Sequence, residues 1–257
     1  MTPPRPAAGL LALVVATTST PILALPEASV DGVVRRFTAE LQQVWRREPA
    51  TAGRPFPSVR VVPSLAAQAC GGAPFPASQP LLLACPSQGA ILLERARLAP
   101  VYAVFGEGGV AFLVAYGLGQ SLLSSLAVAS PPGGIPPPAT PGLQAACAAG
   151  TLLAALPIAT AARRLQLNNA ITAAEQVFES GVAPQLGSGP MRAFAVYSGM
   201  GGSSLDCSAA AMGRLAGGGV NIDSFLATRG ISVPIDAFCR QPPACPRRLT
   251  LGAAGGE

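Results

Sequence analysis

Two long stretches without a charged residue constrain the fold of this chain more than any other feature. They are Val110–Ala129 and Gly142–Ala162, and the Pro-rich segment Pro131–Pro141 lies between them. Stretches of this kind either cross a bilayer as a helical hairpin or form buried helices in the core of a water-soluble protein. Both are rich in Ala and Gly, and Pro157 interrupts the second. These features favour a core, and a membrane hairpin at 110–129 and 142–162 stays open as the alternative.

The rest of the sequence predicts a mainly α fold with a small β element, an α+β class. Residues 30–48 carry apolar side chains at steps of three and four, which is typical of an amphipathic helix packed on a core. Short apolar runs next to turn residues indicate strands. The further elements that we expect are helices at 98–129 (with a break near 106–109), 165–180 and 191–197, a helix from about Leu205 capped by Ser204 and carrying Cys207, and strands at 59–62, 81–84 and 90–93.

The first residues resemble an export signal. Arg5 is the only charged residue before the apolar run Ala7–Val15, and small residues follow at Ala24 and Ala28. A basic start, a short apolar centre and small residues at the cleavage site define a secretory signal peptide. We therefore expect residues 1–28 to be a signal peptide, with an uncleaved N-terminal anchor as the alternative.

The chain has six cysteines. An even number behind an export signal favours disulfides over metal binding, because disulfides persist in oxidising compartments. Six cysteines allow fifteen pairings, so the count alone does not select one. Cys70 with Cys85 and Cys239 with Cys245 would each close a short loop.

The absence of histidine and lysine excludes several mechanisms. All 17 basic residues are arginine, against 12 acidic ones, which gives a net charge of +5. A single chain without His or Lys has no Ser–His, Cys–His or Ser–Lys nucleophile, no lysine Schiff base and no P-loop lysine. Nucleic-acid binding is not expected either, because the arginines are scattered in pairs rather than interleaved with aromatic residues.

Three separated stretches carry a family resemblance. Cys70 lies in A-C-G and Cys85 in A-C-P just before the strand at 90–93; residues 115–121 read A-Y-G-L-G-Q-S; and residues 142–150 read G-L-Q-A-A-C-A-A-G. In order and spacing they resemble the bacterial family of neutral zinc metallopeptidases. That family has paired cysteines, then an A-H-E-x-G-H-H-x-Q helix, then E-L-Q-A-D-C-x-A-G. The resemblance covers roughly residues 30–210 and leaves 211–257 as a loop-rich extension.

The resemblance implies a zincin-like scaffold, stapled by disulfides, that has lost its metal ligands. In H-E-x-x-H two imidazoles on one helical face bind zinc, and the glutamate polarises the metal-bound water. Tyr116, Gly117 and Gln120 stand at those positions here. Gly142 stands where the family has the glutamate expected to be the third ligand, and Ala146 where it has an aspartate. The resemblance also implies a Cys147–Cys207 disulfide.

We therefore expect an exported, catalytically inactive metallopeptidase-like protein with a binding or structural role. No metal or cofactor is expected, the partner is an unknown peptide or protein, and the N-terminal segment offers a possible attachment to a membrane. The location would be periplasmic or extracellular. A hydrolase that uses carboxylates only is a further alternative, for which Glu107 in G-E-G-G, just before the altered helix, is the candidate.

Overall fold

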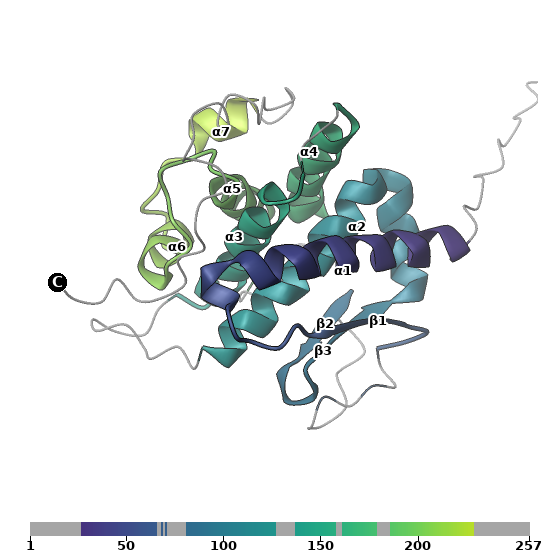
Figure 1. The fold of residues 1–257 in the computed structure, drawn as a ribbon. Helices are drawn as coiled ribbons and strands as arrows, with labels where there is room; N and C mark the ends of the chain where they lie inside the picture. Colours follow the sequence, from purple (N-terminus) through teal and green to yellow (C-terminus); the bar gives the residue numbers. More distant parts are fainter. Residues whose placement is uncertain are drawn as a thin grey trace, which may run out of the picture.

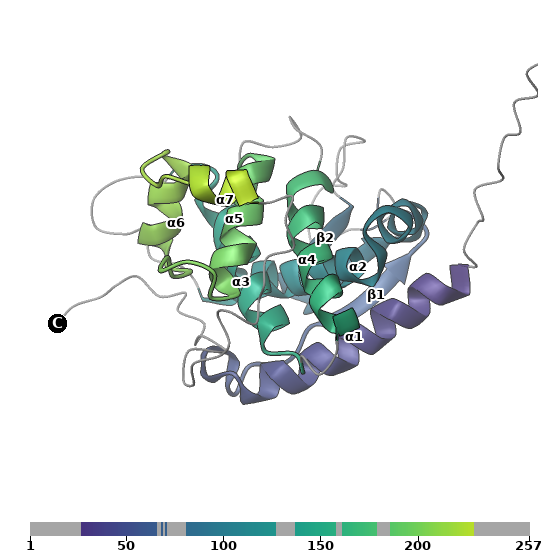
Figure 2. The same cartoon turned by 90° about the horizontal axis from the view of Figure 1, so that it is seen from above.

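Helix α2 (Arg95–Ser125) runs through the middle of the molecule, and most other elements pack around it (Figure 1). The computed structural model describes residues 27–65, 68, 70, 81–126, 137–157, 161–178 and 186–228. The small sheet lies on one side of α2 and helices lie on the others, as two perpendicular views show (Figures 1 and 2). The other elements are α1 (Glu27–Arg47), β1 (Ser58–Val62), β2 (Leu82–Cys85), β3 (Ala90–Glu94), α3 (Thr140–Ala154), α4 (Ala161–Gln176), α5 (Gly189–Gly199), α6 (Ala209–Ala216), α7 (Asp223–Thr228) and two 3-10 turns, Pro49–Thr51 and Pro86–Gln88. The mainly helical α+β class predicted from the sequence is confirmed.

Helix α1 has the amphipathic form predicted for it. Its apolar positions recur at helical steps and are all buried against the core. They are Val30, Val33, Val34, Phe37, Leu41, Val44 and Trp45. The opposite face carries arginine and glutamine and is exposed. The helix therefore covers one side of α2 and presents its polar side to solvent.

Helix α2 is broken near its middle, within the segment where the sequence predicted a break. Gly106 has φ 58° and ψ −154°, a conformation outside the helical region that glycine adopts readily. The part after the break is deeply buried: every residue from Gly108 to Gly119 is covered. The apolar stretch predicted at 110–129 is thus the central core helix, which ends at Ser125.

The three strands form a sheet of order β1-β3-β2, with β1 parallel and β2 antiparallel to β3. Alternate side chains of a strand point to opposite faces. Ile91 and Leu93 accordingly join the main helical core, whereas Ala90 and Leu92 join a smaller cluster on the other face with Cys85. The Cys70–Cys85 disulfide borders this second cluster, so it fastens the far face of the sheet.

Helices α2, α3 and α5 approach one another very closely. A Cβ atom built on Gly119 would lie 2.6 Å from the Ala145 carbonyl oxygen of α3. A Cβ on Gly150 of α3 would lie 2.1 Å from the Val196 oxygen of α5, and one on Gly199 would lie 1.9 Å from the Cys147 oxygen. Such approaches are open only to glycine, because a real Cβ would overlap a neighbouring backbone. Glycines at these three points therefore allow α2, α3 and α5 to pack this closely.

The second uncharged stretch does not form one long helix. Helix α3 ends at Ala154, before Pro157, and α4 begins separately at Ala161. At 15 residues α3 is shorter than the roughly 20 residues that span a bilayer, and all of it except Pro141 is buried. In the described part of the chain, α2 alone has the length and apolar character to cross a membrane. Most of its apolar residues are buried against other elements of the fold, and Val104 is exposed.

The segment after α5 differs from the sequence prediction. Ser204 does not cap a helix that carries Cys207; instead Ser208 caps α6, its hydroxyl accepting a hydrogen bond from the Ala211 amide at 3.2 Å. The packed core also extends beyond residue 210, because Met212, Leu215 and Phe225 are buried in it. Within the loop-rich extension expected at 211–257, the structure describes the helices α6 and α7, of which α6 begins just before it at Ala209.

Two of the three expected disulfides are present. Cys70 is bonded to Cys85, and Cys147 of α3 is bonded to Cys207 just before α6. The Gln144 side chain also donates to the Cys207 carbonyl at 3.2 Å, so α3 holds this segment by a covalent bond and a hydrogen bond. Cys239 and Cys245 lie outside the described residues, as does most of the predicted signal peptide.

Candidate functional site

The five positions expected to be remnants of a zinc site lie on two helices that touch. Tyr116, Gly117 and Gln120 are on α2, and Gly142 and Ala146 are on α3. The helices cross where Gly119 meets the backbone of Ala145, which places the crossing one residue away from both Gln120 and Ala146. The structure therefore brings the two helices together at the part of each that carries these positions.

Tyr116 packs into an aromatic cluster. Its ring centroid is 5.5 Å from that of Phe112, one turn earlier, and 5.2 Å from that of Phe178, which follows α4. The side chain is 1% exposed. Its hydroxyl has no hydrogen-bond partner of good geometry in the described structure. Tyr116 thus fills space between α2 and α4 as an apolar residue would.

The surroundings of Tyr116 keep its phenol neutral. Burial strongly raises the pKa of the hydroxyl, because the phenolate would lose its hydration. Arg192 and Gln120 lie close enough to lower this pKa, but their combined effect is smaller than that of burial. A phenol held in this state does not serve as a base at neutral pH, nor does it supply the anionic oxygen that a metal ion prefers.

Gly117 faces the sheet. A Cβ atom on Gly117 would lie 2.6 Å from the Cγ2 atom of Ile91 in β3. Position 117 is therefore a close contact between α2 and β3. Gly142 and Ala146 are both buried in α3, where a missing side chain and a single methyl group suit a tightly packed helix.

Arg192 is a buried charged residue of this region for which sequence reasoning gave no role. It is 3% exposed. Its guanidinium donates to four backbone carbonyls, those of Ala174 (2.9 Å), Glu175 (3.1 Å), Phe178 (3.0 Å) and Gly187 (2.5 Å). These carbonyls belong to the last turn of α4 and the chain after it, where unpaired acceptors collect. The signal in the sequence is a single charge inside the apolar run 191–197.

The pKa of Arg192 is lowered by burial, and the nearby Tyr116 and Glu175 act in the opposite direction. Arginine remains protonated in proteins despite such shifts. The positive charge at the end of α4 interacts favourably with the negative end of the helix dipole. Its Cζ atom also lies 5.4 Å from the centroid of the Phe178 ring. These contacts give Arg192 a structural role at the end of α4.

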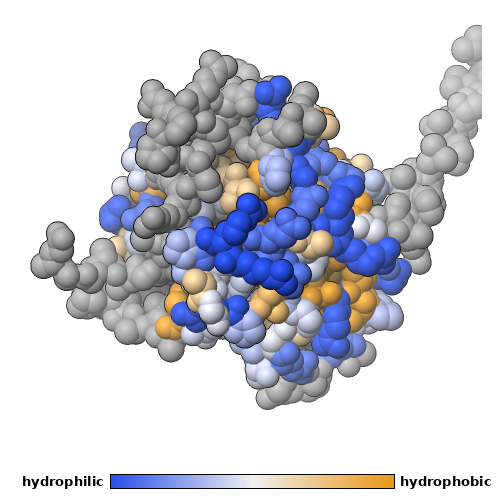
Figure 3. Space-filling model, viewed as in Figure 1, coloured by the Kyte–Doolittle hydropathy of each residue, from blue (hydrophilic) through white to orange (hydrophobic). Residues whose placement is uncertain are grey.

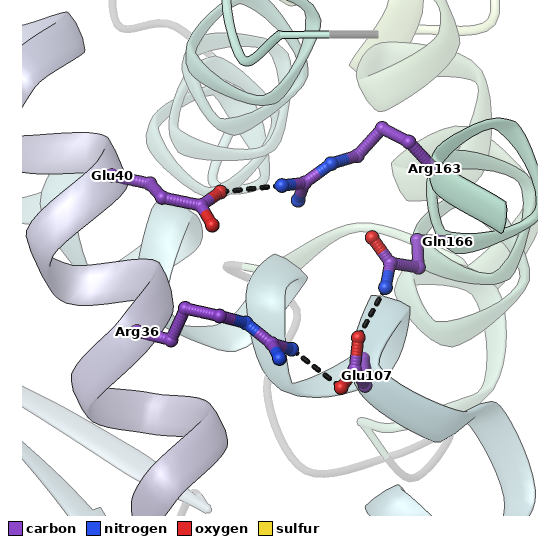
Figure 4. Close-up of polar contacts among 5 residues, drawn as sticks. All are labelled: Arg36, Glu40, Glu107, Arg163 and Gln166. Carbon is purple, nitrogen blue, oxygen red and sulfur yellow. Dashed lines mark hydrogen bonds and ion pairs between the residues drawn. The ribbon is translucent and has the colours of Figure 1, made fainter. Parts of the chain in front are cut away.

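Glu107, the candidate for carboxylate chemistry, lies in a polar cluster between α1, α2 and α4 (Figure 4). One carboxylate oxygen pairs with Arg36 of α1 at 2.5 Å, and the other accepts a short hydrogen bond from the Gln166 amide of α4. Beside it, Glu40 of α1 pairs with Arg163 of α4 at 2.7 Å. Both carboxylates are engaged by neighbouring helices, so the cluster joins α1, α2 and α4.

Phe37 lies within the same cluster as an apolar platform. The Cζ atoms of Arg36 and Arg163 are 5.2 and 5.3 Å from the centroid of its ring. Cations at this distance from an aromatic ring are attracted to it. Phe37 is 1% exposed, and the two arginines therefore close the core over it.

The described part of the chain contains no group of three or more His, Cys, Asp or Glu residues placed to hold a metal ion. What the structure defines is a mainly helical protein with a small three-stranded sheet, two disulfides and a tightly packed centre where α2 crosses α3. No family model, curated protein or solved structure matches the chain.

Proposed function

We propose that this chain is an exported, non-catalytic member of the metallopeptidase-like fold that acts by binding a peptide or protein partner. One observation carries the proposal more than any other: two of the three positions matching H-E-x-x-H are occupied by residues that pack. Tyr116 is enclosed by Phe112 and Phe178, and Gly117 touches Ile91. The chemistry of a zinc helix has been replaced by close packing of the same helix.

The replacement of metal ligands by residues that pack has a physical reason. Imidazoles and carboxylates that no longer hold a metal must find other partners, and each buried polar group left unpaired costs about 1–3 kcal/mol. Glycine, alanine and an enclosed aromatic ring avoid most of this cost. A chain that keeps the helices and loses the ligands therefore keeps its stability without the metal.

Export is supported by the cysteines and by the start of the chain. Two disulfides form in the described structure, and disulfides are typical of oxidising compartments. The apolar run at residues 7–15 follows a single arginine, as in a signal peptide. With its interior closed by packing, such a protein would act through its surface.

The test of this ancestry is to restore the ligands. The variant Tyr116→His/Gln120→His/Gly142→Glu should bind zinc stoichiometrically, because the three positions would again form the ligand set of a zinc peptidase. The wild-type chain should retain none after dialysis against a chelator. Metal analysis of both purified proteins, with circular dichroism to check folding, gives the result.

The matched control moves one ligand off the shared helical face. Tyr116→His/Ser121→His/Gly142→Glu has the same residue types but lacks the i, i+4 spacing. Equal zinc binding by both variants, or no binding by a folded triple variant, would refute the ancestry. Stoichiometric zinc in the wild-type protein would refute the proposed loss of catalysis.

A further inference from the structure

The outward face of α1 is the most basic surface that one element of the described structure presents. Arg35, Arg36, Arg46 and Arg47 are all exposed, and Gln43 lies between the two pairs. At 1.5 Å per residue the arginines span about 18 Å along the helix. Figure 3 shows hydrophilic side chains gathered along the path of α1 across this face, and Figure 2 shows α1 along the outer edge of the molecule.

Asp31 and Glu40, the acidic residues of α1 whose side chains the structure describes, do not neutralise this face. Asp31 pairs with Arg95 at 2.8 Å, and Glu40 pairs with Arg163, so both carboxylates are directed toward the rest of the fold. Among the described residues, Arg36 is the one arginine of the four with an ion pair, to Glu107, and its side chain is still 46% exposed. Arg35 and Arg46 form no ion pair or hydrogen bond in the part of the chain that the structure describes. The charge available to a partner is therefore positive.

The location of α1 in the chain indicates which anionic partner fits. The helix begins at Glu27, directly after the N-terminal segment that contains the apolar run 7–15. Where this segment stays on the chain as the uncleaved anchor, its apolar run and a basic patch together hold the protein at an anionic bilayer more firmly than either alone. Nucleic acid fits less well, because the aromatic side chains of α1, Phe37 and Trp45, are buried and cannot stack on bases.

We infer that the exposed arginine face of α1 (Arg35, Arg36, Arg46 and Arg47) binds the headgroups of an anionic phospholipid bilayer. The helix lies flat on the surface, with its arginines toward the lipid phosphates and its apolar side in the protein core. This lipid contact is separate from the peptide or protein partner proposed above. It also stands whether or not α2 derives from a zinc-binding helix.

The test is sedimentation of the full chain with vesicles of phosphatidylglycerol and phosphatidylcholine, compared with pure phosphatidylcholine. Binding through the apolar segment alone is independent of headgroup charge, so the difference between the two vesicle types isolates the arginine face. Arg35→Gln/Arg46→Gln should lower the partition coefficient for the anionic vesicles roughly 25-fold, from about fivefold per arginine. The control Arg60→Gln/Arg214→Gln removes the same charge from exposed sites on β1 and α6 and should change it less than twofold.

Ionic strength and a second variant complete the experiment. Raising the ionic strength from about 0.01 M to about 0.15 M shortens the Debye length from about 30 to about 8 Å and should weaken wild-type binding. Gln43→Glu, which places a carboxylate in the middle of the face, should also weaken it. Equal binding to both vesicle types, equal loss in the control pair, or tighter binding to duplex DNA than to the anionic vesicles would overturn the inference.

Discussion

The hydroxyl of Tyr116 is a buried polar group whose removal should cost the fold little. It has no hydrogen-bond partner of good geometry in the described structure, so little offsets its desolvation. Tyr116→Phe should leave the free energy of unfolding unchanged or raise it by about 1 kcal/mol. Tyr116→Ala, which removes the ring between Phe112 and Phe178, should lower it by about 3–5 kcal/mol. Urea denaturation at neutral pH measures both, and a clear loss in Tyr116→Phe would mean that the hydroxyl has a partner.

Tyr116 should also determine how stability changes at alkaline pH. Burial raises its pKa in the folded state, whereas in the unfolded chain it titrates near 10. Above that pH the unfolded state gives up the phenol proton, whereas the folded state still holds it. The free energy of unfolding therefore falls as the pH rises, by up to about 1.4 kcal/mol per pH unit. The free energy of unfolding of Tyr116→Phe should therefore decrease less steeply with pH in this range than that of the wild-type protein. Denaturation between pH 8 and pH 11 shows this, and parallel curves for the two proteins would contradict it.

Arg192 should be far more sensitive to substitution than its single charge suggests. Its five donors reach four carbonyls, in the last turn of α4 and in the chain after it, and the shorter, point-like ammonium of lysine would leave several of them unpaired. Arg192→Lys should lower the free energy of unfolding by about 2–4 kcal/mol. Arg214→Lys on the exposed face of α6 is the control and should stay within about 0.5 kcal/mol. If guanidinium denaturation gave the same free energy of unfolding for Arg192→Lys and Arg214→Lys, the carbonyls around residue 192 would have found other donors.

At the scale of elements, glycine at the crossing of α2 and α3 sets how closely the helices pack. A Cβ on Gly119 would meet the backbone of Ala145, which cannot rotate away as a side chain could. Gly119→Ala should therefore destabilise the fold by about 1–3 kcal/mol. Gly32→Ala is the matched control in α1, where the new Cβ has no neighbour closer than 4.0 Å, and it should stabilise by up to about 1 kcal/mol. Thermal unfolding of both variants tests the pair, and a stable Gly119→Ala would show that the helices can separate at no cost.

Elements with strong periodicity could be predicted from the sequence, and their packing partners could not. The apolar positions of α1, such as Phe37 and Leu41, identify its buried face because a helix repeats every 3.6 residues. The break at Gly106 follows from a cluster of glycines. The start of α6 was misplaced because Ser204 and Ser208 are equally good caps locally. The Cys147–Cys207 bond and the turn made by Asp206 select Ser208.

In the candidate site, too, the element could be predicted from the sequence and its packing partners could not. The sequence places Tyr116, Gly117 and Gln120 on one helix, and the lack of metal-binding side chains is visible from the residues alone. It does not show that Tyr116 turns toward Phe178 or that Gly117 rests on Ile91, because both contacts join segments far apart in the chain. Arg192 was missed for the same reason: its partners are backbone carbonyls, which leave no trace in the sequence.

At the scale of the whole molecule, the Cys147–Cys207 bond connects the helical core to the last described part of the chain. It closes a loop with a sequence separation of 60. In the chain-entropy description, closing a loop of this length removes about 4 kcal/mol of unfolded-state freedom, against about 3 kcal/mol for the 15-residue separation of Cys70 and Cys85. Cys147→Ser/Cys207→Ser should thus lower the free energy of unfolding by about 4 kcal/mol and release α6 and α7 first. The matched variant Cys70→Ser/Cys85→Ser should lose somewhat less and loosen the sheet instead.

Hydrogen exchange distinguishes these two regions, because local opening exposes the amides of the affected elements. The first pair of substitutions should increase exchange in α6 and α7, and the second in β2 and β3. Cell fractionation extends the test, since a protein that depends on disulfides of this strength should accumulate only in an oxidising compartment. If both serine pairs were as stable as the wild type, and the chain accumulated in a reducing compartment, the disulfides would be dispensable and the proposal of export would lose its main support.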